Sequence, residues 1–183
     1  MADLAFWKMH GAGNDFILVD DRELTFPCDH RDWIASIARR NVGVGSEGLI
    51  LIQPSEQSDF RMRFFKPDGG EVEMCGNGAR CVARLASEIG AAGTTMQFDT
   101  VAGPIGATVT DDIVTLQMTS PEGWLFDQTL DIDGEKITWH AVNTGVPHVV
   151  VEVPDADAID IIQLGSAIRH HATFAPAGTN ANF

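Results

Sequence analysis

The chain has 183 residues, a hydrophobic share of 44% and a formal net charge of −14. The length allows one large domain or two small ones, and the acidic charge argues against nucleic acid, which selects basic surfaces. We expect no membrane span and no signal peptide, because no apolar run is long enough and the N-terminus lacks a basic start. Three cysteines without an export signal predict reduced thiols in a cytoplasm rather than a disulfide framework.

Hydrophobic periodicity predicts a strand-rich chain with few helices, and therefore an α+β fold in which helices pack on curved sheets. The first helix is expected to be capped by Asp29, and residues 120–123 (SPEG) are typical of a domain junction. Strands are expected at residues 4–9, 16–20, 48–53, 60–66, 96–99, 105–110, 113–118, 130–132, 137–142 and 149–153, and helices at 29–40, 76–89 and 157–170.

The most informative segment is residues 74–81 (MCGNGARC), where a glycine-rich turn becomes a helix that Gly90 ends. Cys75 is expected at the N-terminus of this helix, where free N–H groups and the helix dipole lower the pKa of a thiol. The same N–H groups suit a carboxylate or phosphate, and the glycines allow a ligand to approach the backbone. The segment therefore predicts a reactive thiol beside an anion-binding turn.

A buried thiol is the competing interpretation for this segment, because free cysteines are mostly small core residues. Six positions separate Cys75 from Cys81, which places the two thiols on different faces of a helix and does not match a zinc-ligand spacing. We therefore expect Cys81 in the core, Cys75 exposed and no metal site. Cys28 carries no signal of its own.

Residues 43–48 (GVGSEG) match the glycine spacing of a dinucleotide-binding loop. Such a loop requires a strand before the glycines and a helix after them, so that the helix N-terminus meets the pyrophosphate. Here a helix is expected before the loop and a strand after it. We therefore predict no nucleotide cofactor and interpret the loop as a helix C-cap with a close backbone approach.

Four short clusters of glycine and polar residues fall in expected loops. They are residues 11–16 (GAGNDF), 74–81 (MCGNGARC), 143–148 (NTGVPH) and 178–183 (GTNANF). Each cluster alone is ordinary turn chemistry. Together and in this order they resemble the diaminopimelate epimerase family, with a resemblance that runs from Phe6 to Phe183 and is most specific in the first two clusters.

The resemblance implies an isomerase that interconverts LL- and meso-diaminopimelate, without cofactor or metal, in lysine and peptidoglycan synthesis. Two thiols would exchange the α-proton from opposite faces of the carbon, while N–H groups aimed at the carboxylate stabilise the carbanion. The implied catalytic residues are Cys75, as one thiol, and His148, which helps to tune a thiol. The implied substrate-binding positions are Asn14, Lys66, Gly76, Asn77 and Asn180. The implied partner is the small-molecule substrate, with neither nucleic acid nor membrane, and a homodimer is left open.

Three positions depart from the pattern of the family. Lys66 in residues 64–69 (FFKPDG) stands where many members carry a substrate-contacting Asn, which puts substrate placement or identity in doubt. Val146 replaces an Asn found in one version of its loop, and Glu47-Gly48 replaces Asp-Gly or Asp-Gln. Lys66 keeps a second interpretation open, namely a related two-thiol racemase or isomerase that acts on another amino acid.

The resemblance further implies two pseudo-repeat domains, each a curved, mostly antiparallel sheet or barrel around a central helix. The first domain is expected at residues 1–119, and residues 120–183 begin a second, incomplete one. Cys75 follows Asn14 by 61 positions, whereas three residues follow Asn180, so no second Cys-Gly-x-Gly turn is present. We therefore expect the 183-residue polypeptide alone to be poorly active. A non-catalytic diaminopimelate-binding protein is the third interpretation.

Overall fold

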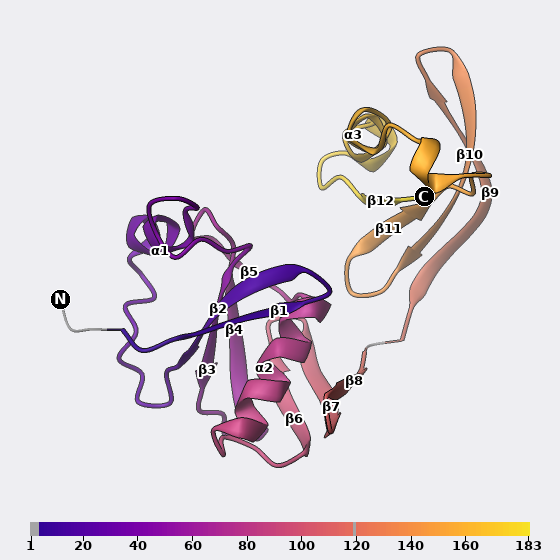
Figure 1. Ribbon diagram of the computed structural model, residues 1–183. Helices are drawn as coiled ribbons and strands as arrows, with labels where there is room; N and C mark the ends of the chain where they lie inside the picture. Colours follow the sequence, from indigo (N-terminus) through magenta and orange to yellow (C-terminus); the bar gives the residue numbers. More distant parts are fainter. Residues whose placement is uncertain (1–3, 119) are drawn as a thin grey trace. The chain divides into compact units, whose positions relative to one another are not determined.

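The computed structural model describes residues 4–118 and 120–183, which form two compact units, one ending at Gln117 and one beginning at Met118 (Figure 1). The expected domain boundary at residue 119 falls outside the described residues. The first unit contains β1 (Trp7–Gly11), β2 (Asn14–Asp20), α1 (Arg31–Ala38), β3 (Leu49–Gln53), β4 (Phe60–Phe65), β5 (Glu71–Val72), α2 (Gly76–Glu88), β6 (Thr95–Thr100), β7 (Gly103–Thr110) and β8 (Ile113–Gln117). The second contains β9 (Glu122–Ile132), β10 (Glu135–Asn143), β11 (Pro147–Val150), a 3-10 turn (Ala156–Ala158), α3 (Ile161–Arg169), another 3-10 turn (Ala172–Phe174) and β12 (Asn180–Asn182).

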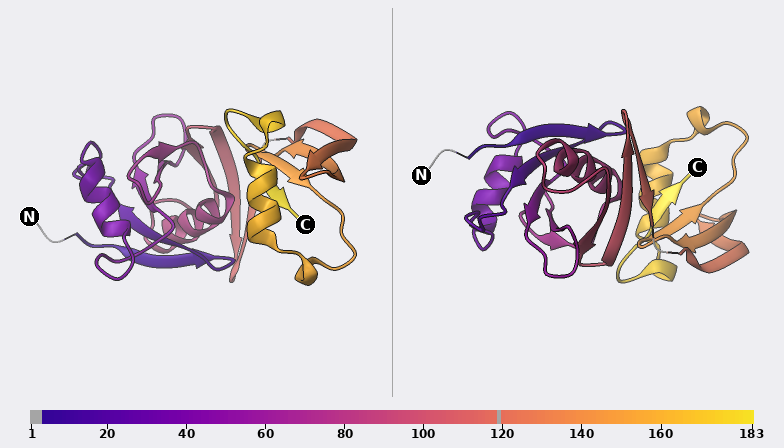
Figure 2. Two further views of the ribbon diagram at one scale, coloured as in Figure 1. Left: turned by 90° about the horizontal axis from the view of Figure 1, so that it is seen from above. Right: turned by 90° about the horizontal axis from the view of Figure 1, so that it is seen from below.

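The first unit is a sheet with the strand order β1-β2-β3-β4-β6-β7-β8, and β5 pairs with β4. The pairs β2–β3 and β4–β6 are parallel, and the other pairs of this sheet are antiparallel. The sheet curls around α2, which contacts β1, β2, β3, β4, β7 and β8 (Figure 2). The expected α+β class, with a curved and mostly antiparallel sheet around a helix, is confirmed for this unit.

Strand β2 is buried on both faces of the sheet. Phe16 and Leu18 pack in the core that contains the α2 side chains, whereas Ile17 and Val19 pack in a second core with Ile34 of α1. Successive side chains of a strand point to opposite faces, so one apolar run serves both cores. The first residues of β2 therefore also divide between a face toward α2 and a face toward α1.

Helix α1 is shorter than the sequence predicts. His30, rather than Asp29, occupies the N-cap position, and the helix ends at Ala38 instead of residue 40. The C-cap residue is Arg39 and not a residue of the glycine loop at 43–48, but that loop does return to the helix end: Gly45, with a φ of +75°, donates its N–H to the Ile37 carbonyl at 3.1 Å. Helix α1 precedes this loop and β3 follows it, which is the order that the sequence predicts.

The second unit has the strand order β12-β11-β10-β9, with β11 and β12 parallel and the other pairs antiparallel. Its core consists of Leu130, Trp139, Val149, Val151 and Ile168. Strand β9 already begins at Glu122, inside the segment expected as a junction, because Glu122 pairs with Asn143 of β10.

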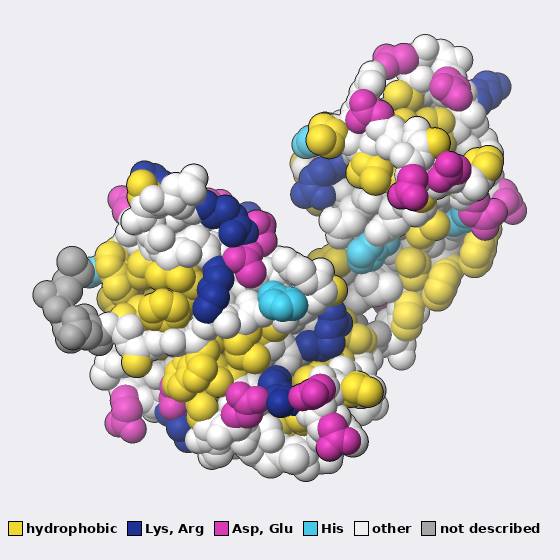
Figure 3. Space-filling model, in the orientation of Figure 1, with side chains coloured by type: hydrophobic (Ala, Val, Ile, Leu, Met, Phe, Trp, Pro, Cys, Tyr) yellow, Lys and Arg dark blue, Asp and Glu magenta, His cyan; other side chains and the backbone are white. Residues whose placement is uncertain are grey.

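Acidic side chains are dispersed over the visible face of each unit rather than gathered in one patch (Figure 3). Among the described residues, no helix has the length and apolar character that a membrane crossing requires. Within the same residues, no group of three or more His, Cys, Asp or Glu side chains is arranged to hold a metal ion.

Candidate active site

Cys75 is the N-cap residue of α2, with extended backbone angles of φ −143° and ψ 121°. The Cys75 carbonyl accepts the first helical hydrogen bond, from Ala79 N–H at 2.7 Å, and the Cys75 side chain makes no capping hydrogen bond. The N–H groups of the first turn have no partners within the helix, so they remain available to an anion. The thiol is half-buried against the core around α2, so the expectation of an exposed Cys75 was too strong.

The other two cysteines have different surroundings. Cys81 is buried in the core of the first unit, as expected, and burial raises the pKa of its thiol to about 11. Cys28 is half-buried, its sulfur accepts a long contact of 3.8 Å from the Gln53 amide, and burial raises the pKa of its thiol as well. Neither thiol lies at the N-terminus of a helix.

The tip of the β1–β2 hairpin lies against the first turn of α2. A Cβ placed on Gly11 would lie 2.8 Å from the Asn77 carbonyl oxygen and 3.3 Å from its Cα, so the contact requires glycine. Gly78 allows a similar approach on the side of the sheet, because a Cβ there would lie 2.7 Å from Ile50 Cδ1. Gly11 thus lets the hairpin backbone approach the helix beside Cys75, and Gly78 lets the Ile50 side chain of β3 do so.

Asn14 follows the two-residue turn Ala12-Gly13, whose φ values of 53° and 83° are typical of a type I′ hairpin. It pairs with Gly11, the residue that contacts Asn77. Alternation along β2 places Asn14 on the same face as Phe16, which is the face toward α2. The hairpin thus brings Asn14 close to the turn that carries the thiol. Arg80 donates a hydrogen bond to Asn77 Oδ1, which leaves the side-chain NH₂ group of Asn77 available as a donor.

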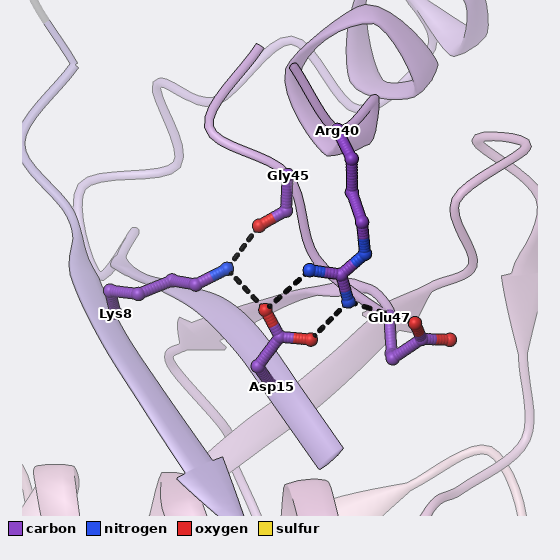
Figure 4. Close-up of polar contacts among 5 residues, drawn as sticks. All are labelled: Lys8, Asp15, Arg40, Gly45 and Glu47. Atoms are coloured by element: carbon purple, nitrogen blue, oxygen red, sulfur yellow. Dashed lines mark hydrogen bonds and ion pairs between the residues drawn. The ribbon is translucent and has the colours of Figure 1, made fainter. Parts of the chain in front are cut away.

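Asp15 lies on the opposite face of β2 and forms an ion-pair cluster with Lys8, Arg40 and Glu47 (Figure 4). The Asp15 carboxylate accepts from Arg40 Nη2 at 2.6 Å and from Lys8 Nζ at 2.6 Å, and Arg40 also reaches Glu47 at 2.9 Å. The hydrogen bonds from Arg40, and then the one from Lys8, hold the pKa of Asp15 well below its usual range. The sequence analysis did not predict this cluster. The available signal was the strand alternation, which places Asp15 on the face of β2 opposite to Asn14.

Lys66 lies on the exposed turn between β4 and β5, and its ammonium group is 3.8 Å from the Asp68 carboxylate. Arg31 at the start of α1 contacts the same turn: its Nε donates to the Asp68 carbonyl at 3.0 Å. This turn is therefore held against the start of α1.

His148 and Asn180 belong to the second unit, where they are partners across the parallel pair β11–β12. Together with Arg169 and His170 of the α3 end they line a hollow of about 460 Å³. Arg169 Nη1 donates to Asn180 Oδ1 at 3.4 Å, and Asn182 Nδ2 lies 3.3 Å from His148 Nδ1. Two expected site residues, 32 positions apart, thus share one surface of this unit.

Comparison with known proteins identifies the family. Residues 6–124 match the family described as diaminopimelate epimerase. The diaminopimelate epimerase of Aquifex aeolicus is 41% identical to this chain, over 98% of this chain and 68% of that protein. The diaminopimelate epimerase of Methanothrix thermoacetophila is 41% identical, over 100% of this chain and 70% of that protein.

The chain belongs to the diaminopimelate epimerase family. The membership expected from the four clusters is thereby confirmed, and the family is one of isomerases. This diaminopimelate epimerase family member spans about seven tenths of the length of the two curated relatives.

Solved structures support the fold of the family member. A probable proline racemase from Agrobacterium radiobacter matches with a TM-score of 0.66 at 16% identity, over 93% of this chain and 61% of that one. A phenazine biosynthesis protein of the PhzF family from Bacillus anthracis matches with a TM-score of 0.63 at 22% identity, over 86% and 58%. At these identities the likeness concerns the fold alone.

Proposed function

We propose that this chain supplies one catalytic thiol and part of the substrate site of an enzyme that converts LL- to meso-diaminopimelate without a cofactor. The observation that carries the proposal is the contact of the β1–β2 hairpin with α2, where a Cβ on Gly11 would lie 2.8 Å from the Asn77 oxygen. This contact surrounds one helix end with a thiol, free N–H groups and the Asn14 amide. Such a set suits an amino acid with a carboxylate beside its stereocentre.

In the proposed step, the Cys75 thiolate removes the α-proton of the substrate. The Cα–H bond breaks, an S–H bond forms, and the electron pair remains on Cα and spreads into the substrate carboxylate. The N–H groups of Gly76 and Asn77 bind that carboxylate, and they bind it more strongly as negative charge develops. An acid on the opposite face of the carbon then donates a proton to Cα, which inverts the stereocentre.

The remaining assignments follow the family resemblance. Asn14 and Asn180 hold the amino and carboxylate groups of the substrate, and His148 helps to tune a thiol. Lys66 departs from the family pattern, because it stands where many members carry a substrate-contacting Asn; from that position its ammonium group would bind a substrate carboxylate in place of the exposed Asp68 carboxylate. The thiol must be reduced, which is the state that a cytoplasm maintains.

The second acid in this reaction is, by resemblance, another thiol. Cys81 is a poor candidate because it is buried with a pKa of about 11, and Cys28 is held beside Gln53 outside any Cys-Gly-x-Gly turn. We therefore propose that a polypeptide of these 183 residues exchanges the α-proton at most slowly and does not epimerise efficiently by itself.

Hydrogen–deuterium exchange at the substrate α-carbon tests the proposal. LL-diaminopimelate is incubated in deuterium oxide with the chain, with Cys75→Ser and with Cys81→Ser as a matched control at a buried thiol. We expect exchange that Cys75→Ser reduces to background and that Cys81→Ser retains. An undiminished rate in Cys75→Ser would defeat the thiol role, and rapid two-way epimerisation by the 183-residue polypeptide would defeat the need for a second acid.

The Lys66 substitution favours one alternative, a two-thiol racemase or isomerase that acts on another amino acid. A panel of amino acids in the same exchange assay separates the two activities, because the alternative requires faster exchange on a substrate other than diaminopimelate. Tight calorimetric binding of diaminopimelate without any exchange would instead support a non-catalytic binding protein.

A further inference from the structure

The Asp15 cluster links three segments that are distant in the sequence. Lys8 comes from β1, Asp15 from β2, and Arg40 from the segment after α1. Lys8 also donates to the Gly45 carbonyl, and Glu47 N–H donates to the Asp15 carbonyl at 2.8 Å. The side chains of Asp15, Lys8 and Arg40 are 21%, 36% and 55% exposed, so the cluster lies at the surface and not in the core.

A surface location limits what such ion pairs add to folding, because solvent screens them and side-chain ordering opposes them. The geometry is nevertheless specific, since Arg40 binds both oxygens of Asp15, at 2.6 and 3.2 Å. Bidentate pairs of this kind fix orientation as well as distance. The cluster is therefore better suited to holding the hairpin in place than to stabilising the whole unit.

The part of the hairpin that is held is the part that meets the thiol helix. Asp15 directly follows Asn14 but points to the other face of β2, toward the α1 side where Arg40 lies. The turn before Asn14 contains Ala12 at a φ of 53°, a conformation that non-glycine residues rarely adopt. A strained turn needs support from its surroundings to remain in one position.

We propose that Asp15 is a positioning residue: through the Lys8 and Arg40 pairs it fixes the hairpin tip, and with it Asn14, over the first turn of α2. Loss of the carboxylate charge would let the tip move away from Asn77 and would weaken the binding of a substrate carboxylate there. The functional half of this inference rests on the proposed function, whereas the placement of the tip does not.

The test compares Asp15→Asn with Asp20→Asn. The Asp20 carboxylate lies in the same strand and binds Arg22 through both oxygens, at 2.8 and 2.7 Å, so its loss removes a matched surface pair away from α2. Three quantities are measured in the full chain: the nuclear Overhauser effect between the Hα protons of Gly11 and Asn77, the affinity for LL-diaminopimelate, and the urea midpoint of unfolding. Arg40→Gln is a second variant that leaves the Lys8 pair in place.

We expect Asp15→Asn to lose or strongly weaken the Gly11–Asn77 signal and to weaken diaminopimelate binding about tenfold, since small misplacements of a positioning group are costly. Arg40→Gln should act in the same direction, and its result decides the matter if Asp15→Asn fails to fold. Asp20→Asn should keep the Gly11–Asn77 signal and the affinity for diaminopimelate, with a urea midpoint similar to that of Asp15→Asn.

The proposal is overturned if Asp15→Asn keeps both the signal and the affinity, or if Asp20→Asn reduces them equally, because a general loss of ion pairing would then explain the effect. A wild-type chain that shows the Gly11–Asn77 signal but binds no diaminopimelate would instead refute the proposed function, while the signal in Asp15→Asn would still decide the positioning role.

Discussion

Gly11 offers the sharpest test of the active-site geometry. The φ of Gly11 is not in the positive region, so alanine can adopt the same backbone conformation. The cost of Gly11→Ala therefore comes only from steric overlap of the new Cβ. The new Cβ would lie 2.8 Å from the Asn77 oxygen. Ordinary contact begins at 3.4 Å, so the hairpin and α2 would have to separate by roughly 0.6 Å.

This separation should affect chemistry more than folding. Overpacking of this kind costs about 1–3 kcal/mol of unfolding free energy. A displacement of about 1 Å can lower an enzymatic rate about 100-fold, so roughly 0.6 Å predicts a loss near tenfold in Cys75-dependent exchange. Urea unfolding measures the first quantity, and α-proton exchange in deuterium oxide measures the second.

Gly13→Ala is the control for this variant. Gly13 has a φ of 83° and nothing within 4 Å of its Cβ position, so alanine there strains the same turn by about 1–2 kcal/mol without touching α2. The reasoning is refuted if Gly11→Ala matches the wild type in both assays. It is also refuted if Gly13→Ala slows exchange as much as Gly11→Ala does.

Three further predictions concern the first unit. Because burial raises the pKa of Cys81 to about 11, roughly one Cys81 thiol in a thousand is ionised at pH 8. Maleimide should therefore label Cys75 in the native chain and Cys81 only after unfolding, and mass spectrometry can measure both products. The pKa of Asp15 is lower in the folded than in the unfolded chain, so the ionised carboxylate stabilises the fold above the unfolded pKa of about 3.9. This stabilisation is lost as the pH falls toward the folded-state pKa. The difference in urea midpoint between the wild type and Asp15→Asn should therefore shrink below about pH 3. Leu85→Ala, at a fully buried position of α2, should lower the unfolding free energy by about 2–5 kcal/mol, and a change below 1 kcal/mol would contradict the packing of α2 in the curled sheet.

Local signals in the sequence predicted the thiol helix closely. The helix expected at 76–89 is observed at Gly76–Glu88. The agreement is close because the signals that begin and end it, the glycine-rich turn and Gly90 at a φ of +67°, are adjacent to the helix in the sequence. Where the ends of elements depend on distant partners, the predictions were less accurate. Strand β9 starts at Glu122, inside the expected junction, because Asn143 of β10 pairs with it.

The candidate site was predictable in its parts but not in its assembly. The clusters marked Asn14 and Cys75, yet the contact between Gly11 and Asn77 joins residues 66 positions apart, and no local pattern indicates it. The burial of Cys75 was underestimated for the same reason, since side chains of the curled sheet pack around it. The Asp15 cluster depends on Arg40, 25 positions away, which the helix prediction had assigned to α1.

The division of β2 between its two faces has a consequence for evolution of the hairpin. The buried residues from Phe16 onward hold β2 in its register, so one residue inserted between Asp15 and Phe16 would exchange the directions of Asn14 and Asp15. A carboxylate would then confront the helix end that is suited to anions, and an amide would confront Arg40. An insertion at this point of β2 should therefore be selected against as strongly as substitution of Asn14 or Asp15, although neither side chain belongs to a core.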